Sequence, residues 1–70
     1  MREIRVEPSG KRWAVRRVGS PRNLALTDTQ EEAMSIGRQH AWRTRCEFTV
    51  LGRDGRIRER DSYGTHPYPG

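Results

Sequence analysis

The sequence predicts an α+β domain with the order β-β-α-β-β, in which one helix packs on one face of an antiparallel sheet. Three observations support this fold class. Two pairs of short segments alternate apolar and polar residues around a glycine-containing turn, which is typical of β-hairpins. Between them lies one segment with a capping signature and small residues at helical spacing. With 70 residues, the chain has room for a single small domain.

The first hairpin consists of two alternating runs. Ile4 and Val6 alternate with charged residues until Pro8, which ends the run, and a Ser-Gly pair then supplies a turn. Trp13 and Val15 continue the alternation in a second strand. Trp13 is expected in the core, because a chain with few apolar residues needs its large aromatic side chains there.

A break at Gly-Ser-Pro separates this hairpin from the helix. Residues 23–26 (Asn-Leu-Ala-Leu) are interpreted as a short connector that can be extended. Thr29 followed by Glu32 is a capping-box signature that marks the start of a helix, although Asp28 with Glu31 competes for the same role.

The helix has a narrow stripe of small and flexible side chains: Ala33, Met34, Gly37 and Ala41. Glycine in a helix interior costs about 1 kcal/mol relative to alanine. We therefore expect Gly37 to allow a close approach between the helix and the sheet. Acidic residues at the start of the helix and arginines near its end match the helix dipole.

The second hairpin surrounds a Gly-Arg-Asp-Gly turn at residues 52–55, with alternation through Phe48 and Val50 before it. A two-residue loop would place Val50 opposite Glu59, whereas a four-residue loop would place it opposite Ile57. The longer loop is favoured, because it puts two apolar side chains on one face. Cys46, at the start of the first of these strands, is interpreted as a small core residue.

Two segments resemble a known bacterial family. Residues 28–33 (Asp-Thr-Gln-Glu-Glu-Ala) and 52–64 (Gly-Arg-Asp-Gly-Arg-Ile-Arg-Glu-Arg-Asp-Ser-Tyr-Gly), with the Trp-Ala-Val strand at 13–15, are similar to the family catalogued as domain of unknown function 2188. The resemblance covers nearly the whole chain and implies a small β-β-α-β-β domain. It implies no activity. His40 and Leu51 depart from the family pattern, and both are interpreted as structural.

Composition and length exclude several classes of protein. Only 31% of the residues are hydrophobic, and no apolar run is long enough to span a membrane or to serve as a signal peptide. A multidomain enzyme and a buried cofactor cavity are excluded by size. The single cysteine cannot form an intramolecular disulfide, which favours a reducing cytoplasm. We expect a cytoplasmic domain over residues 1–63 and a Gly/Pro-rich tail over 64–70.

The number and placement of the arginines suggest a first possible function, the binding of nucleic acid. The chain has 14 basic and 9 acidic residues, a net charge of +5, and a pI near 10.7. If the apolar strand residues face the helix, six arginines share the opposite sheet face: Arg5, Arg12, Arg16, Arg56, Arg58 and Arg60. Guanidinium groups bind phosphate well, so we expect this face to contact the backbone of DNA or RNA by counterion release.

The arginines also have simpler explanations. A GC-rich coding sequence favours arginine over lysine, and glutamates could pair with these arginines across strands. A continuous basic face would favour nucleic acid, whereas alternating Arg–Glu pairs would favour a protein-interaction or regulatory module. That module would act through its edge strands, Trp42, Tyr63 and Tyr68. A homodimer is also expected, because a second copy would enlarge a thin core.

Catalytic chemistry is not predicted. His40, His66 and Cys46 are the candidate nucleophile and base residues, and no third group is placed to orient them. No clustered spacing of His, Cys or carboxylates predicts a metal site, and no cofactor motif is present in the sequence. We therefore expect a non-enzymatic protein without catalytic residues, metal or cofactor.

Overall fold

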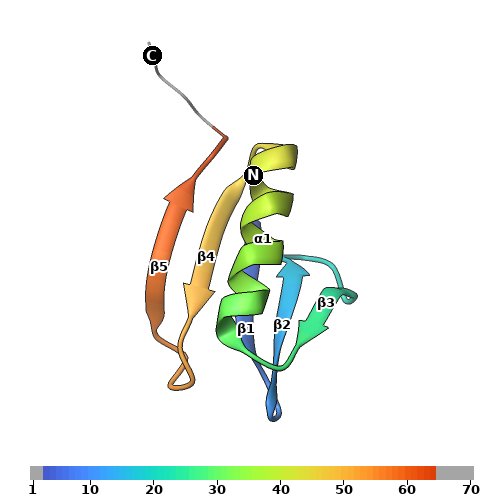
Figure 1. Ribbon diagram of the computed structural model, residues 1–70. Coiled ribbons are helices and arrows are strands. Elements are labelled where there is room, and N and C mark those ends of the chain that lie inside the picture. Colours follow the sequence, from blue (N-terminus) through green and yellow to red (C-terminus); the bar gives the residue numbers. More distant parts are fainter. Residues whose placement is uncertain (1–2, 65–70) are drawn as a thin grey trace.

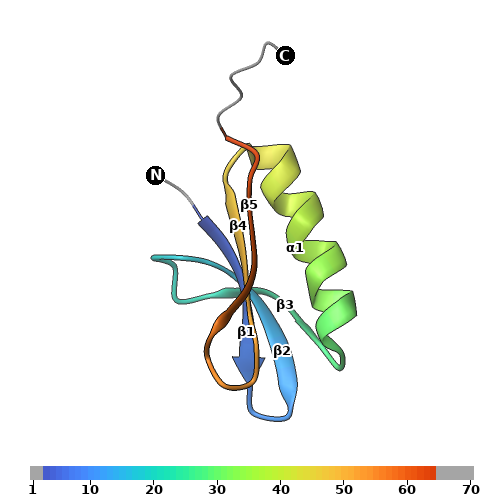
Figure 2. The same ribbon diagram turned by 90° about the vertical axis from the view of Figure 1, so that its left-hand side faces the viewer.

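Five strands and one helix make up residues 3–64, the part of the chain that this computed structural model describes. The strands are β1 (Glu3–Ser9), β2 (Arg12–Arg17), β3 (Asn23–Thr27), β4 (Glu47–Leu51) and β5 (Ile57–Ser62), and the helix is α1 (Gln30–Thr44). They form one sheet in the order β3-β2-β1-β4-β5 (Figure 1). Seen from the side, α1 lies on one face of the sheet (Figure 2). The predicted α+β class with one helix packed on one face is confirmed.

Two features of the sheet differ from the prediction. The segment interpreted as a connector forms β3, which pairs antiparallel with β2. In addition, β1 and β4 run parallel, so the sheet is mixed rather than antiparallel. The path of the chain explains the parallel pair. After β3, α1 carries the chain back along the sheet, and β4 therefore starts at the same end as β1 (Figure 1).

The helix begins and ends with defined caps. The Thr29 hydroxyl accepts a hydrogen bond from the Glu32 backbone N–H at 3.2 Å, so Thr29 is the N-cap and Asp28 is not. At the other end, Arg45 adopts a left-handed conformation with φ of 55°, and its backbone N–H donates to the Ala41 carbonyl. A non-glycine residue in this conformation carries a conformational cost.

The core lies between the small-residue stripe of α1 and the central strands. Ala33, Gly37 and Ala41 are the buried residues of the helix. The sheet contributes larger buried side chains: Ile4, Val6, Trp13, Val15, Cys46, Phe48 and Val50. The core positions of Trp13 and Cys46 are confirmed.

Gly37 is the point of closest approach. A Cβ atom at this position would lie 2.9 Å from Cε1 of Phe48 and 3.1 Å from Cγ2 of Val6. Only glycine fits at this distance. The predicted close approach of helix and sheet is therefore confirmed, and it explains a glycine in a helix interior.

The predicted register of the second hairpin is wrong. Val50 pairs with Glu59, and Leu51 pairs with Ile57, so Arg58 is an extra residue that forms a β-bulge. The Gly52 N–H donates to the Arg56 carbonyl at 2.8 Å and closes the turn. As a result Ile57 faces away from the core and is 54% exposed. The backbone geometry of the turn, rather than the pairing of apolar side chains, sets the register here.

Within residues 3–64, no helix combines the length and the apolar character that a membrane span requires.

We predict that Gly37→Ala destabilises the domain. The added methyl group would push against the buried Phe48 ring, and overpacking of this kind costs about 1–3 kcal/mol, more than alanine gains in helix propensity. Urea denaturation of both proteins measures the difference. Ser35→Ala, at an exposed position of the same helix, is the matched control and should not lower the free energy of unfolding. A Gly37→Ala variant as stable as the natural chain would contradict the close-packing argument.

Candidate binding surfaces

The sheet face away from α1 carries a transverse row of polar side chains. The strand register aligns Arg16 of β2, Arg5 of β1, Thr49 of β4 and Arg60 of β5. Side chains alternate between the two faces of a sheet, and the strand neighbours of Arg5 are buried under α1. The row therefore lies on the opposite face, as predicted for these three arginines.

Two arginines of this row are held in ion pairs. Arg16 contacts Glu7 at 2.9 Å, and Arg5 contacts Glu3 at 3.2 Å. The four side chains are only 22–31% exposed, so they lie flat against the sheet instead of extending into solvent. Hydrogen bonding to Glu7, together with its negative charge, raises the pKa of Arg16.

A polar group is buried beside Arg5 on this face. Thr49 is 2% exposed although no helix covers its face. Its hydroxyl has no hydrogen-bond partner among the described residues. Arg–Glu ion pairs, and not a continuous row of unpaired arginines, therefore occupy the centre of this face.

The remaining predicted arginines lie nearer the margins of the sheet. Arg12 pairs with Asp28 at 3.2 Å, and Arg56 approaches Asp54 at 3.9 Å. Both pairs are largely exposed, so they hold their arginines weakly. Arg58 and Arg60 form no ion pair within residues 3–64. The six arginines therefore do not form one continuous basic surface.

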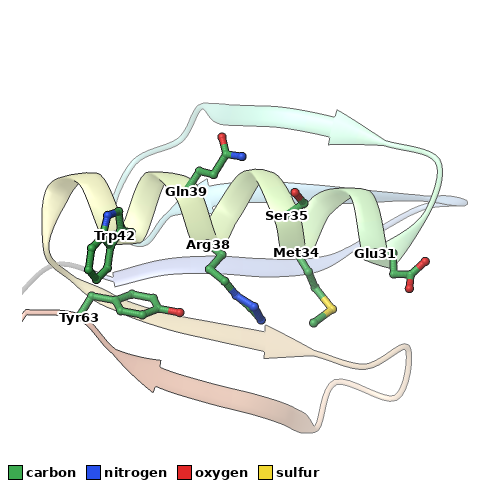
Figure 3. A pocket seen from close by; sticks show the side chains of 7 residues that line it. All are labelled: Glu31, Met34, Ser35, Arg38, Gln39, Trp42 and Tyr63. Carbon is green, nitrogen blue, oxygen red and sulfur yellow. The ribbon is translucent and has the colours of Figure 1, made fainter.

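The other face contains a groove. The helix packs on β1, β2, β3 and β4 but makes no close backbone contact with β5. The resulting groove has a volume of about 530 Å³ and is lined by six helix residues and one residue that follows β5 (Figure 3): Glu31, Met34, Ser35, Arg38, Gln39, Trp42 and Tyr63. The spacing of three and four residues along α1 is the sequence signal that could have identified this surface.

One end of the groove is aromatic. The rings of Trp42 and Tyr63 meet edge to face, with centroids 5.8 Å apart (Figure 3). The Arg45 guanidinium lies 5.6 Å from the centre of the Trp42 ring. Trp42 is 61% exposed, so it belongs to the surface and not to the core. Burial and the nearby Asp61 carboxylate raise the pKa of Tyr63.

Arg38 lines the groove between Met34 and Trp42 (Figure 3). It donates to Glu59 of β5 at 2.7 Å, and its guanidinium lies 5.1 Å from the centre of the Phe48 ring. Arg38 therefore connects α1 to the one strand that the helix does not cover. Local sequence patterns give no signal for the pair of Arg38 with Glu59, because the two residues lie 21 positions apart.

Cys46, the candidate nucleophile, belongs to the core. Cys46 is buried and lies 3.2 Å from the Thr44 hydroxyl. Residues 3–64 contain no group of three His, Cys, Asp or Glu side chains that could hold a metal ion. His66 and Tyr68, which the sequence analysis considered, lie outside the described residues.

Comparison with known proteins gives one match. A family model described as "Uncharacterized protein conserved in bacteria (DUF2188)" matches residues 4–63. No curated protein and no solved structure matches the chain significantly.

We predict that Thr49→Val stabilises the domain, by about 1 kcal/mol, because it replaces a buried hydroxyl that has no partner with a methyl group of similar shape. Thr27→Val is the matched control. The Thr27 hydroxyl donates to the Thr29 carbonyl at 2.7 Å, so its removal should destabilise by a similar amount. Thermal and urea denaturation measure both changes. A Thr49→Val variant that loses stability would show that this hydroxyl is satisfied.

Tyr63 should ionise at higher pH than an ordinary tyrosine. Burial favours its neutral form, so the folded-state pKa lies above that of the unfolded chain. Its contribution to stability is complete below the unfolded pKa and is lost as the pH rises through the folded pKa. Ultraviolet absorbance titration of the natural chain, minus that of Tyr63→Phe, isolates this group. A difference curve with an ordinary or lowered midpoint would contradict the burial of Tyr63.

Proposed function

Because this chain belongs to the bacterial family DUF2188, whose description assigns no function, we propose a function from the surface of the domain itself. We propose that it is a non-enzymatic cytoplasmic module that binds single-stranded nucleic acid where α1 ends. In this proposal Trp42 stacks on a base, and Arg43 and Arg45 contact the neighbouring phosphates.

The exposure of Trp42 beside arginines is the observation that carries the proposal. Trp42 is the most exposed of the large hydrophobic residues in the described chain, and Arg45 lies against its ring. Proteins that bind single strands combine aromatic rings, on which bases stack, with arginines that follow the phosphates. The adjoining groove is of a size typical of small-ligand sites, roughly 300–1,000 Å³, and so has room for a base.

The distribution of charge along α1 supports the same location. The helix starts among acidic residues, with Asp28 before it and Glu31 and Glu32 in its first turn. It ends with Arg43 in the last turn and Arg45 at the C-cap, and neither forms an ion pair within residues 3–64. In a chain with a net charge of +5, a polyanion is attracted overall and is repelled from the acidic end of the helix.

The sheet face predicted from the sequence is a weaker candidate. Its central arginines, Arg5 and Arg16, are already engaged by glutamates. A phosphate there would have to compete with ion pairs that are mostly buried. Arg58 and Arg60 remain available at the β5 margin, and they provide a direct comparison with the helix end.

The proposal predicts binding to short single-stranded oligonucleotides at low salt. Fluorescence anisotropy of a labelled oligo(dT) measures affinity, and quenching of tryptophan emission reports stacking on Trp42, because Trp13 is buried. Loss of one stacked base costs about 1–3 kcal/mol, so Trp42→Ala should weaken binding about tenfold, whereas Trp42→Phe should bind nearly as well. Each lost phosphate contact should reduce the slope of log K against log salt by about 0.7.

Arg45→Gly gives a control for folding. Glycine suits the left-handed conformation at this C-cap, so the variant should fold at least as well while losing one phosphate contact. Arg58→Ala with Arg60→Ala should leave affinity nearly unchanged. If this pair abolishes binding and Trp42→Ala does not, the sheet margin is the site. No binding at low salt would overturn the proposal and leave the groove as a surface for a protein partner.

A further inference from the structure

Exposed apolar side chains gather at one edge of the sheet. Large hydrophobic residues with exposed side chains number five in the described chain: Val18, Leu24, Leu26, Trp42 and Ile57. Three of them belong to the β2–β3 side, where β3 is the edge strand (Figure 1). Val18 follows the last residue of β2, and Leu24 and Leu26 lie in β3. We call these three residues the β3 patch.

The strand β3 itself carries no charge. It reads Asn-Leu-Ala-Leu-Thr and contains no charged residue. Arg16, opposite Asn23, is balanced by Glu7 at 2.9 Å, whereas Arg17 and Arg22 flank the patch and form no ion pair within residues 3–64. Two copies of a domain with a net charge of +5 repel each other except where their facing surfaces carry little charge. The two leucines of β3 provide such a surface between the flanking arginines.

The strand at the opposite edge of the sheet, β5, is highly charged. In β5, arginines at 58 and 60 alternate with acidic residues at 59 and 61. A two-fold axis that pairs β5 with itself in antiparallel fashion places residues of the same face opposite one another. Arginine would then face arginine, and glutamate would face glutamate or aspartate, which opposes pairing. Self-association through β5 is therefore disfavoured, although Ile57 is the most exposed aliphatic side chain.

We propose that a second copy of this chain docks on the β3 patch through a two-fold interface. An isologous contact brings each leucine of β3 against the leucines of its partner copy. Apolar groups are complementary to themselves, so no opposite charge is required. The contact would cover Leu26, which is 45% exposed, and Leu24 and Val18, which are each 38% exposed.

The contact is made by side chains rather than by a continuous ten-stranded sheet. The pairing of β2 with β3 shifts by one residue between Val15 and Arg16, so Leu24 has no partner on β2 and forms a bulge. Bulges on edge strands interrupt the regular row of backbone donors and acceptors that another strand would need. A patch of three large side chains is also small for an interface, so we expect a concentration-dependent dimer of micromolar or weaker affinity.

Sedimentation equilibrium over a wide concentration range tests this inference. The natural chain should move from 8.2 kDa towards twice that mass as concentration rises. Leu26→Lys should raise the dissociation constant about tenfold or more, because it puts like charges at the centre of the patch. Ile57→Lys is the matched control, since it makes the same type of change at the exposed edge of β5 and should leave the dimer intact. Circular dichroism establishes that each variant is folded.

Salt provides an independent measurement. Screening of the net charge should strengthen an apolar dimer, whereas it weakens the binding of nucleic acid. The two proposals therefore respond to salt in opposite directions and can fail separately. A natural chain that stays at 8.2 kDa at about millimolar concentration would overturn the β3 interface, since even weak interfaces populate dimers there. So would a dimer that Ile57→Lys disrupts and Leu26→Lys does not.

Discussion

The close contact between α1 and the sheet at Gly37 is the constraint on which the rest of this structure depends. The helix contributes only small buried residues, and the sheet contributes the large ones, so the core exists because the two layers approach until Phe48 and Val6 nearly touch the helix backbone. A helix that lies this close covers β1 to β4, while β5 projects beyond it. The groove, the Arg38–Glu59 bond between α1 and β5 and the exposed position of Trp42 all follow from that geometry.

A single helix leaves the second face of the sheet without a covering layer. Arginine and glutamate side chains in ion pairs occupy the middle of that face, and Thr49, beside Arg5 in the register, is buried there. Arginine in this protein therefore has two different roles. Some guanidinium groups are part of the packing, since their aliphatic stems cover apolar surface. Others, such as Arg43 and Arg45, form no ion pair within residues 3–64 and are the ones able to meet a ligand.

The surface is accordingly divided into regions of different character. The end of α1 combines an exposed indole with uncompensated positive charge. The centre of the face away from the helix is neutralised by internal pairs, and the strand β3 is apolar and uncharged. A net charge distributed in this way can support binding of an anion at one place and self-association at another. Composition alone reports only the sum of these regions.

The sequence by itself determined the local features of this protein. Thr29 and Glu32 predicted the start of the helix, the small-residue stripe predicted its buried side, and alternation predicted four of the five strands, because each of these signals depends on neighbours within a few positions. It also placed Arg5, Arg16 and Arg60 on one face, since alternation in a strand fixes the side on which each residue lies.

Tertiary structure alone decided the features that depend on residues far apart in the chain. The strand at 23–27 forms because β2 offers it a free edge, and β1 and β4 are parallel because of the direction in which α1 returns along the sheet. The bulge at Arg58 and the closure of the turn by Gly52 set the register of β5. This register does not place Val50 opposite Ile57, which the pairing of apolar side chains would favour. Whether an arginine is paired, and whether Trp42 is exposed, depends on which strands and which glutamates the fold brings beside it. Such contacts are set by three-dimensional packing, and local sequence patterns do not predict them.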